Sequence, residues 1–349
     1  PPPPPPHPPT PATSTQVNSS AASDVYKRQI HDIPGWVKWN FEGYEGKADY
    51  AEYRTLMETV DTLPPGRIMW EANGDMNKYG TPMALMLFPY WSEGHPSMEG
   101  LFFESSLTTP FHFLNASEVS ERPSNPVRGL DYRGFNMERG VEHLAVYNVA
   151  YYVSYTEAGA EAARAEGLAE VGVALPWRIY ALPPSNLVDI ATSLPAVWAG
   201  GGDFLDPALE WYDDVDNMDR WLVEDGPADW NRVETVDERL ITVDEVAGAG
   251  VVSDVVSGDH RISFTTSAVG VPHLVKVSYF PNWTAEGAEG PYRAAPSLMV
   301  VVPTSEQVVL EFKNTYAENI GMALTLIALV GLGVYGYRRF RNRSVVDAA

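Results

Sequence analysis

The chain of 349 residues contains no cysteine, and it carries only 24 lysines and arginines against 46 aspartates and glutamates. The lack of cysteine excludes disulfide bonds and thiolate metal sites. The net charge of −22 gives a surface that repels nucleic acids and anionic lipid headgroups. We therefore expect no nucleic-acid partner, and a well-solvated domain.

Signatures of several enzyme classes are also missing. The sequence contains neither the nucleophile pattern G-x-S-x-G nor the P-loop pattern. Its seven histidines are scattered, and no two stand at the spacing of a zinc site. We predict no metal and no cofactor, and the sequence leaves open whether the chain is an enzyme.

The first 29 residues differ from the rest of the chain. They begin PPPPPPHPPTPATSTQ, continue to SSAASDVYKRQ, and lack any apolar period; the first methionine is Met57. The second run resembles translated sequencing-adapter DNA, and the alternative is a natural proline-rich linker, which also lacks a packed core. We predict that residues 1–29 are disordered and absent from the natural protein, whose N-terminal part would then be missing here.

An apolar run near the C-terminus predicts a membrane helix. Residues 320–337, IGMALTLIALVGLGVYGY, carry no charge and are just long enough to span a bilayer. The basic segment RRFRNR follows at once, and residues 338–349 form a basic tail. Because positive flanks favour the cytoplasm, we expect a cytoplasmic C-terminus and an extracytoplasmic bulk of the chain in the cell membrane. A buried core helix is the alternative interpretation.

The hydrophobic period divides the remaining chain into two predicted domains. Residues 30–245 mix helical patterns, such as residues 48–63, with short apolar strands such as RIMWE. Residues 246–316 alternate apolar and polar side chains in five segments: VVSDVVSG, HRISFTTSAV, PHLVKVSYF, SLMVVVPT and QVVLEF. The predicted fold class is α+β, with a mixed α/β domain, an antiparallel β-sandwich-like domain and one C-terminal transmembrane helix.

The densest polar and aromatic stretch is SMEGLFFESSLTTPFHF. It contains Glu99, Glu104 and His112, and carboxylates beside an imidazole can perform acid–base chemistry or bind a ligand. Glu71 and Tyr90 are candidates to join them in space. The alternative is that these side chains are solvated or paired for structural reasons.

A second candidate surface is the segment SYFPNWTAEGAEGPYR. Tyr279, Trp283 and Tyr292 surround a connection rich in proline and glycine, and flat aromatic rings stack on sugars. We predict a partly exposed aromatic platform for a glycan. The alternative is a tryptophan that closes one end of the sandwich.

Several segments together resemble the YfhO-like proteins and those with a 6-pyruvoyl-tetrahydropterin-synthase-related membrane domain, which are bacterial multi-pass membrane proteins. The segments are LPPGRIMWE, YGTPMALMLFPYW, SMEGLFFESSLTTPFHFLN, RGVEHLAVYNVAYYV and VPHLVKVSYFPNWTAEGAEGPYR. Those proteins look like GT-C glycosyltransferases, in which the catalytic acid lies on an early loop that this sequence lacks.

The resemblance implies an accessory extracytoplasmic part and the last membrane helix of a polytopic envelope protein that uses a lipid-linked sugar. The implied partners are the bilayer, a polyprenyl-linked sugar and an envelope glycan. The alternative is a non-catalytic, membrane-anchored ectodomain that binds a glycan or a protein. A tail-anchored hydrolase is a third possibility, and no motif in the sequence favours it.

Overall fold

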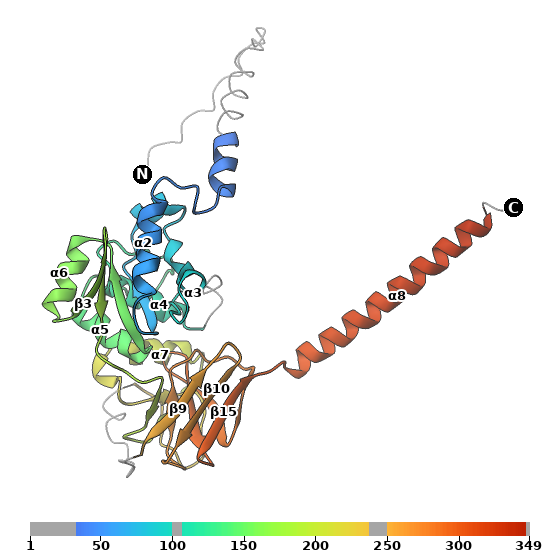
Figure 1. Cartoon of the computed structure of the whole chain (residues 1–349). Helices are drawn as coiled ribbons and strands as arrows, with labels where there is room; N and C mark the ends of the chain where they lie inside the picture. The colour runs from blue at the N-terminus through green and yellow to red at the C-terminus, as the bar shows by residue number, and fades with distance from the viewer. Residues whose placement is uncertain (1–32, 100–106, 237–249, 347–349) are drawn as a thin grey trace, which may run out of the picture.

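The computed structural model describes residues 33–99, 107–236 and 250–346. Figure 1 shows a body of two lobes and one long helix, α8, that leaves the body and points away from it. The helical lobe comprises described residues 33–182, and the sandwich lobe comprises described residues 183–312. The predicted α+β class is confirmed.

The helical lobe is built on a four-stranded sheet with the order β1-β2-β4-β3. Its first two strands are parallel, and the other neighbours are antiparallel. In the second strand, Tyr151 and Val153 face one core and Tyr152 between them faces the other, as the two-residue period of a strand requires. The strands are β1 (Arg67–Trp70), β2 (Val149–Ser154), β3 (Ala169–Ala174) and β4 (Trp177–Ala181).

Helices cover both faces of this sheet. The pattern over residues 48–63 forms α2 (Tyr50–Val60), which ends just before Pro64 and Pro65, because proline cannot continue a helix. With it pack η1 (Gly74–Tyr79), η2 (Ala84–Leu87) and α3 (Phe88–Trp91). The opposite face carries α4 (Thr109–Glu118), α5 (Met137–Val146) and α6 (Glu157–Ala165).

The sandwich lobe packs two sheets face to face. The order of one is β12-β15-β10-β9, and that of the other is β5-β11-β14-β13-β7-β6-β8. The five predicted strands are present as β9 (Val252–Ser257), β10 (Arg261–Thr266), β11 (His273–Val275), β14 (Leu298–Pro303) and β15 (Gln307–Phe312). The aromatic connection predicted between two of them instead forms β12 (Trp283–Glu286) and β13 (Ala288–Ala294).

The seven-stranded sheet crosses the predicted domain boundary at residue 246. Four of its strands come from the earlier part of the chain: β5 (Val188–Ile190), β6 (Ala196–Trp198), β7 (Leu222–Val223) and β8 (Arg232–Val233). The two lobes also share one core, because Tyr152 of the first sheet and Val300 of the second belong to the same buried cluster. We call this cluster, with α4 to α6 and α7 (Leu205–Tyr212), the middle layer. A 3-10 turn, η4 (Val215–Asn217), follows α7.

Helix α8 (Tyr316–Val346) contains one span long and apolar enough to cross a membrane, Tyr316–Arg339. Its 24 residues extend about 36 Å at 1.5 Å per residue, which exceeds the ~30 Å of a bilayer core. Thr315 and Glu318 form a capping box at its start, with the Thr315 amide donating to Glu318 over 2.6 Å. Asn282 of the sandwich lobe also donates to Glu318, over 2.8 Å, so the body holds the first turn of α8 directly.

Candidate functional site

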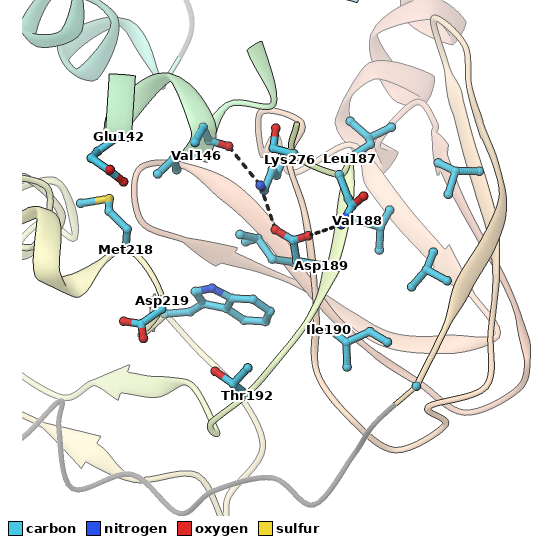
Figure 2. Close-up of a pocket in the computed structure, with 18 of the residues that line it drawn as sticks. Glu142, Val146, Leu187, Val188, Asp189, Ile190, Thr192, Met218, Asp219 and Lys276 are labelled. Carbon is cyan, nitrogen blue, oxygen red and sulfur yellow. Dashed lines mark hydrogen bonds and ion pairs between the residues drawn. The ribbon is translucent and has the colours of Figure 1, made fainter. Parts of the chain in front are cut away.

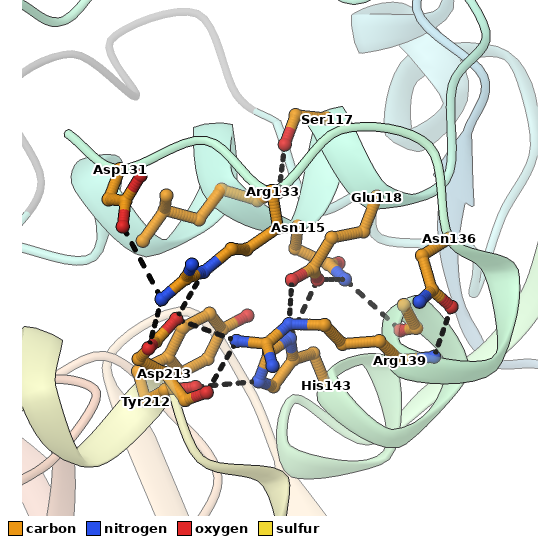
Figure 3. Close-up of polar contacts among 12 residues, drawn as sticks. Asn115, Ser117, Glu118, Asp131, Arg133, Asn136, Arg139, His143, Tyr212 and Asp213 are labelled. Carbon is orange, nitrogen blue, oxygen red and sulfur yellow. Dashed lines mark hydrogen bonds and ion pairs between the residues drawn. The ribbon is translucent and has the colours of Figure 1, made fainter.

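A buried polar network joins α4, α5 and α7 in the middle layer (Figure 3). The carboxylate of Glu118, which is only 2% exposed, is bonded on both oxygens. Arg139 Nε donates to Oε1 over 2.7 Å, and His143 Nδ1 lies 2.7 Å from Oε2. Arg139 also donates to the backbone oxygen of Asp213 over 2.7 Å. The network therefore fixes the three helices to one another.

Both ring nitrogens of His143 lie within hydrogen-bond distance of an oxygen. Nδ1 faces the Glu118 carboxylate, and Nε2 lies 2.9 Å from the backbone oxygen of Tyr212, which can only accept. The ring stacks on that of Tyr212, with 3.7 Å between centroids. At the exposed end, the hydrogen bonds and charge of Arg133 lower the pKa of Asp213. Every charged group at this position thus has a partner of opposite sign, as a structural clamp requires.

Sequence reasoning missed this clamp. Its partners are separated by 21 to 80 positions in the chain, as in the pairs Glu118 with Arg139 and Arg133 with Asp213. The signal present was the four-residue spacing of Arg139 and His143, which places both side chains on one face of α5.

A cleft of about 840 Å³ opens between the end of α5, strand β5 and the turn after α7 (Figure 2). Lys276 crosses its inner end, with Nζ 2.8 Å from Asp189 Oδ2 and 3.0 Å from the backbone oxygen of Ala145. Glu142 and Asp219 are exposed at the other side of the cleft. Trp211 and Trp221 contribute to its lining. The cleft thus combines aromatic surface, two exposed carboxylates and one ion pair.

A smaller pocket of about 180 Å³ also borders Lys276. Arg67 Nη1 donates there to the backbone oxygens of Tyr147 and Lys276. Burial lowers the pKa of Arg67 to about 10. The hydroxyl-bearing residues that line the pocket are Ser97, Thr108, Tyr147 and Ser278.

The structure brings together two of the predicted site residues. His112 Nε2 lies 2.5 Å from Glu99 Oε1, both side chains are buried, and His112 lines the small pocket. A carboxylate in this position orients the imidazole and can exchange a proton with it. Glu104 lies outside the described residues.

The structure does not add Glu71 and Tyr90 to this pair. The Glu71 carboxylate accepts from the amides of Tyr155 and Thr156, each over 2.8 Å, and therefore caps the start of α6. Tyr90 is 76% exposed on α3, on the opposite face of the first sheet. The expectation that both residues join Glu99 and His112 is therefore corrected.

The predicted aromatic platform is also corrected. Trp283 is only 8% exposed and packs in the sandwich core, where its ring meets Phe312 edge-on at 5.4 Å. Tyr279 packs against this same core, whereas Tyr292 packs against the middle layer beside Trp230. Trp283 lies on β12 of the four-stranded sheet and Tyr292 on β13 of the seven-stranded sheet, so the rings do not form one surface.

Comparisons of the chain with protein-family models, with curated proteins and with solved structures found no match. Within residues 33–99, 107–236 and 250–346, no three histidine, aspartate or glutamate side chains gather closely enough to hold a metal ion.

Proposed function

We propose that this chain is an extracytoplasmic region with the last membrane helix of a polytopic envelope protein, and that it binds a glycan in the cleft between its lobes. Its role would be that of an accessory part of a glycosyltransferase that uses a lipid-linked sugar. The cleft of about 840 Å³ carries this proposal, because its volume lies in the usual range for ligand sites.

The chemistry of the cleft supports a glycan. Sugar hydroxyls donate to carboxylates, and the carboxylates of Glu142 and Asp219 are exposed in the cleft. Asp219 Oδ1 lies 3.9 Å from Arg220 Nε, which is beyond hydrogen-bonding distance. Trp221 lines the cleft but is only 9% exposed, so the exposed carboxylates and not aromatic stacking support the glycan proposal.

Lys276 and Asp189 form an ion pair, so their charges balance each other. Their remaining N–H groups and oxygens could bond the hydroxyls of a sugar.

The orientation in the membrane rests on the basic end of α8. Arg338 and Arg339 follow the apolar span and favour a cytoplasmic C-terminus. Because the chain has no cysteine, a single cysteine introduced at Ala349 or Ser253 labels cleanly. A membrane-impermeant thiol reagent on intact cells should label Ser253→Cys and spare Ala349→Cys. The reverse pattern would contradict the proposed orientation.

The glycan proposal is tested with the full chain in lipid nanodiscs, screened on an array of bacterial surface glycans and titrated with the best binder. Asp219→Asn and Glu142→Gln should each weaken binding by about threefold to tenfold, the value of one hydrogen bond. Matched controls are Asp216→Asn, in the same turn, and Glu138→Gln, one turn earlier on α5; neither residue lines the cleft. No binder on the array, or equal losses in the controls, would refute the proposal.

Binding without any transferase activity of the natural full-length protein would favour the second candidate, a non-catalytic binding ectodomain. The cleft suits that role equally, because glycan binding needs only the shape and hydrogen-bonding groups described above.

A further inference from the structure

Arg67 carries a partly buried positive charge that no carboxylate compensates within the described part of the chain. It begins β1, and its Nη1 donates only to backbone oxygens, those of Tyr147 and Lys276. Burial alone accounts for the lowered pKa of Arg67, and no neighbouring charge offsets it. Removing a charge from water without giving it a counter-ion costs free energy. An anion bound beside Arg67 would supply the missing counter-charge.

The other charged residues around the pocket are already paired. Lys276 Nζ lies 2.8 Å from Asp189, and the His112 ring lies 2.5 Å from Glu99. These two carboxylates therefore have partners of their own. Arg67 differs from Lys276 and His112 in having no such partner among the described residues.

The space beside Arg67 has the size and lining for a small anion. The pocket of about 180 Å³ is several times the ~30 Å³ that one water occupies in the liquid. Thr108 and Ser278 line it with hydroxyl oxygens that lie 3.4 Å apart, whereas Ser97 already donates its hydroxyl to the backbone oxygen of Glu99. A guanidinium presents five N–H donors in a planar fork, and the donors on Nε and Nη2 suit the two oxygens of one oxyanion.

We propose that the pocket beside Arg67 and Ser278 is a binding site for a small oxyanion, the phosphate or carboxylate group of a ligand. Arg67 would hold two oxygens of that group in a bidentate contact, and the exposed hydroxyl of Ser278 would donate to another. In a chain with a net charge of −22, a cation without a carboxylate partner provides a local site for an anion on a generally repulsive surface. The site is separate from the proposed glycan cleft.

The test measures the thermal unfolding of the full chain in a non-ionic detergent, at constant ionic strength set with chloride. A ligand of the folded state raises the unfolding midpoint in a saturable manner. Inorganic phosphate, acetate and a short-chain phosphatidic acid serve as separate probes. Stabilisation by phosphate alone assigns a free phosphate group, by acetate alone a carboxylate, and tighter binding of the phosphatidic acid a lipid headgroup.

Arg67→Met should abolish the stabilisation, and Arg67→Lys should weaken anion affinity about tenfold because lysine lacks the fork. If Arg67→Met does not fold, Ser278→Ala removes an exposed hydroxyl at the rim and should still lower the affinity. Arg232→Met is the matched control, since Arg232 also donates to backbone oxygens but is exposed and outside the pocket. Glu142→Gln, in the cleft, should leave anion binding unchanged.

The proposal is overturned if no probe raises the midpoint of the wild type, or if Arg67→Met folds and keeps the full response. Either result would leave the glycan proposal standing, because the glycan array and the Glu142 and Asp219 variants test the cleft independently.

Discussion

The two faces of the seven-stranded sheet meet very different surroundings. On β14, Leu298 and Val300 face the middle layer, which contains the Glu118 clamp and borders both cavities. Met299 and Val301 face the sandwich core, where the buried cluster is aliphatic and aromatic. The alternating side chains of β14 thus face two layers: the middle layer, which contains charged residues and borders the cavities, and the closely packed sandwich core.

The difference separates two ways of holding a protein together. In the sandwich core, stability comes from removing apolar surface from water, and any cavity is a loss. In the middle layer, charges are buried, so geometry depends on each finding a partner. Glu118 has such partners and acts as a clamp, whereas Arg67 has no carboxylate partner among the described residues, and we propose an anion site beside it.

The largest effect is expected in the middle layer, from Glu118→Gln. The substitution leaves Arg139 and His143 without their shared carboxylate, and removing one partner of a buried pair costs about 3–5 kcal/mol. Chemical denaturation should show this loss as a lower midpoint. Glu138→Gln on the same helix is exposed and should change stability by less than about 0.5 kcal/mol.

A loss below about 1 kcal/mol for Glu118→Gln would mean that the clamp is dispensable. The two layers would then not differ in what stabilises them, because the middle layer would also depend on apolar packing alone.

The next effect belongs to the sandwich core. Trp283→Ala should cost about 3 kcal/mol, at the low end for a buried tryptophan because this ring lies at the sheet edge. The glycan affinity of the cleft should be unchanged in protein that remains folded. An unaltered unfolding midpoint together with a loss of glycan binding would restore the aromatic platform that the burial of Trp283 argues against.

The sequence predicted five of the sandwich strands, most clearly β10 and β15, in which every second side chain is buried. It did not predict β12 and β13, since the prolines and glycines around Pro281 and Gly290 are typical of loops. It also misplaced the domain boundary. Strands β5 to β8 are only two or three residues long, and their pairing with distant strands leaves no local period to detect.

The same limit applied to the candidate site. Glu99 and His112 are 13 positions apart in one polar stretch, so their pairing was within reach of sequence reasoning. Arg67 was overlooked, because the sequence around it reads only as a buried strand. Its pocket is also lined by Lys276, 209 positions later, and only the folded chain shows that no carboxylate within residues 33–99, 107–236 and 250–346 pairs with Arg67.

The smallest effect is expected from His273, a polar side chain buried within the sandwich lobe. His273 of β11 is fully buried, bonds Thr266 of the facing sheet over 2.8 Å, and donates from Nδ1 to the Val271 backbone oxygen over 2.7 Å. Burial lowers the pKa of His273 below its usual 6.5. The unfolded chain therefore binds a proton in a pH range where the folded chain does not, so this contribution is present above about pH 6.5 and is lost as pH falls towards the lowered value.

His273→Gln removes that titration while retaining a polar side chain. The stability difference between wild type and variant, measured by denaturation, should therefore narrow as pH falls from about 7.5 to about 5.5. His260→Gln, on the exposed turn before β10, should show no such narrowing. A constant difference for His273→Gln would mean that the buried ring accepts its proton as easily as a free one. The sandwich core would then be as tolerant of charge as the middle layer, and the distinction between the two faces of the sheet would not hold.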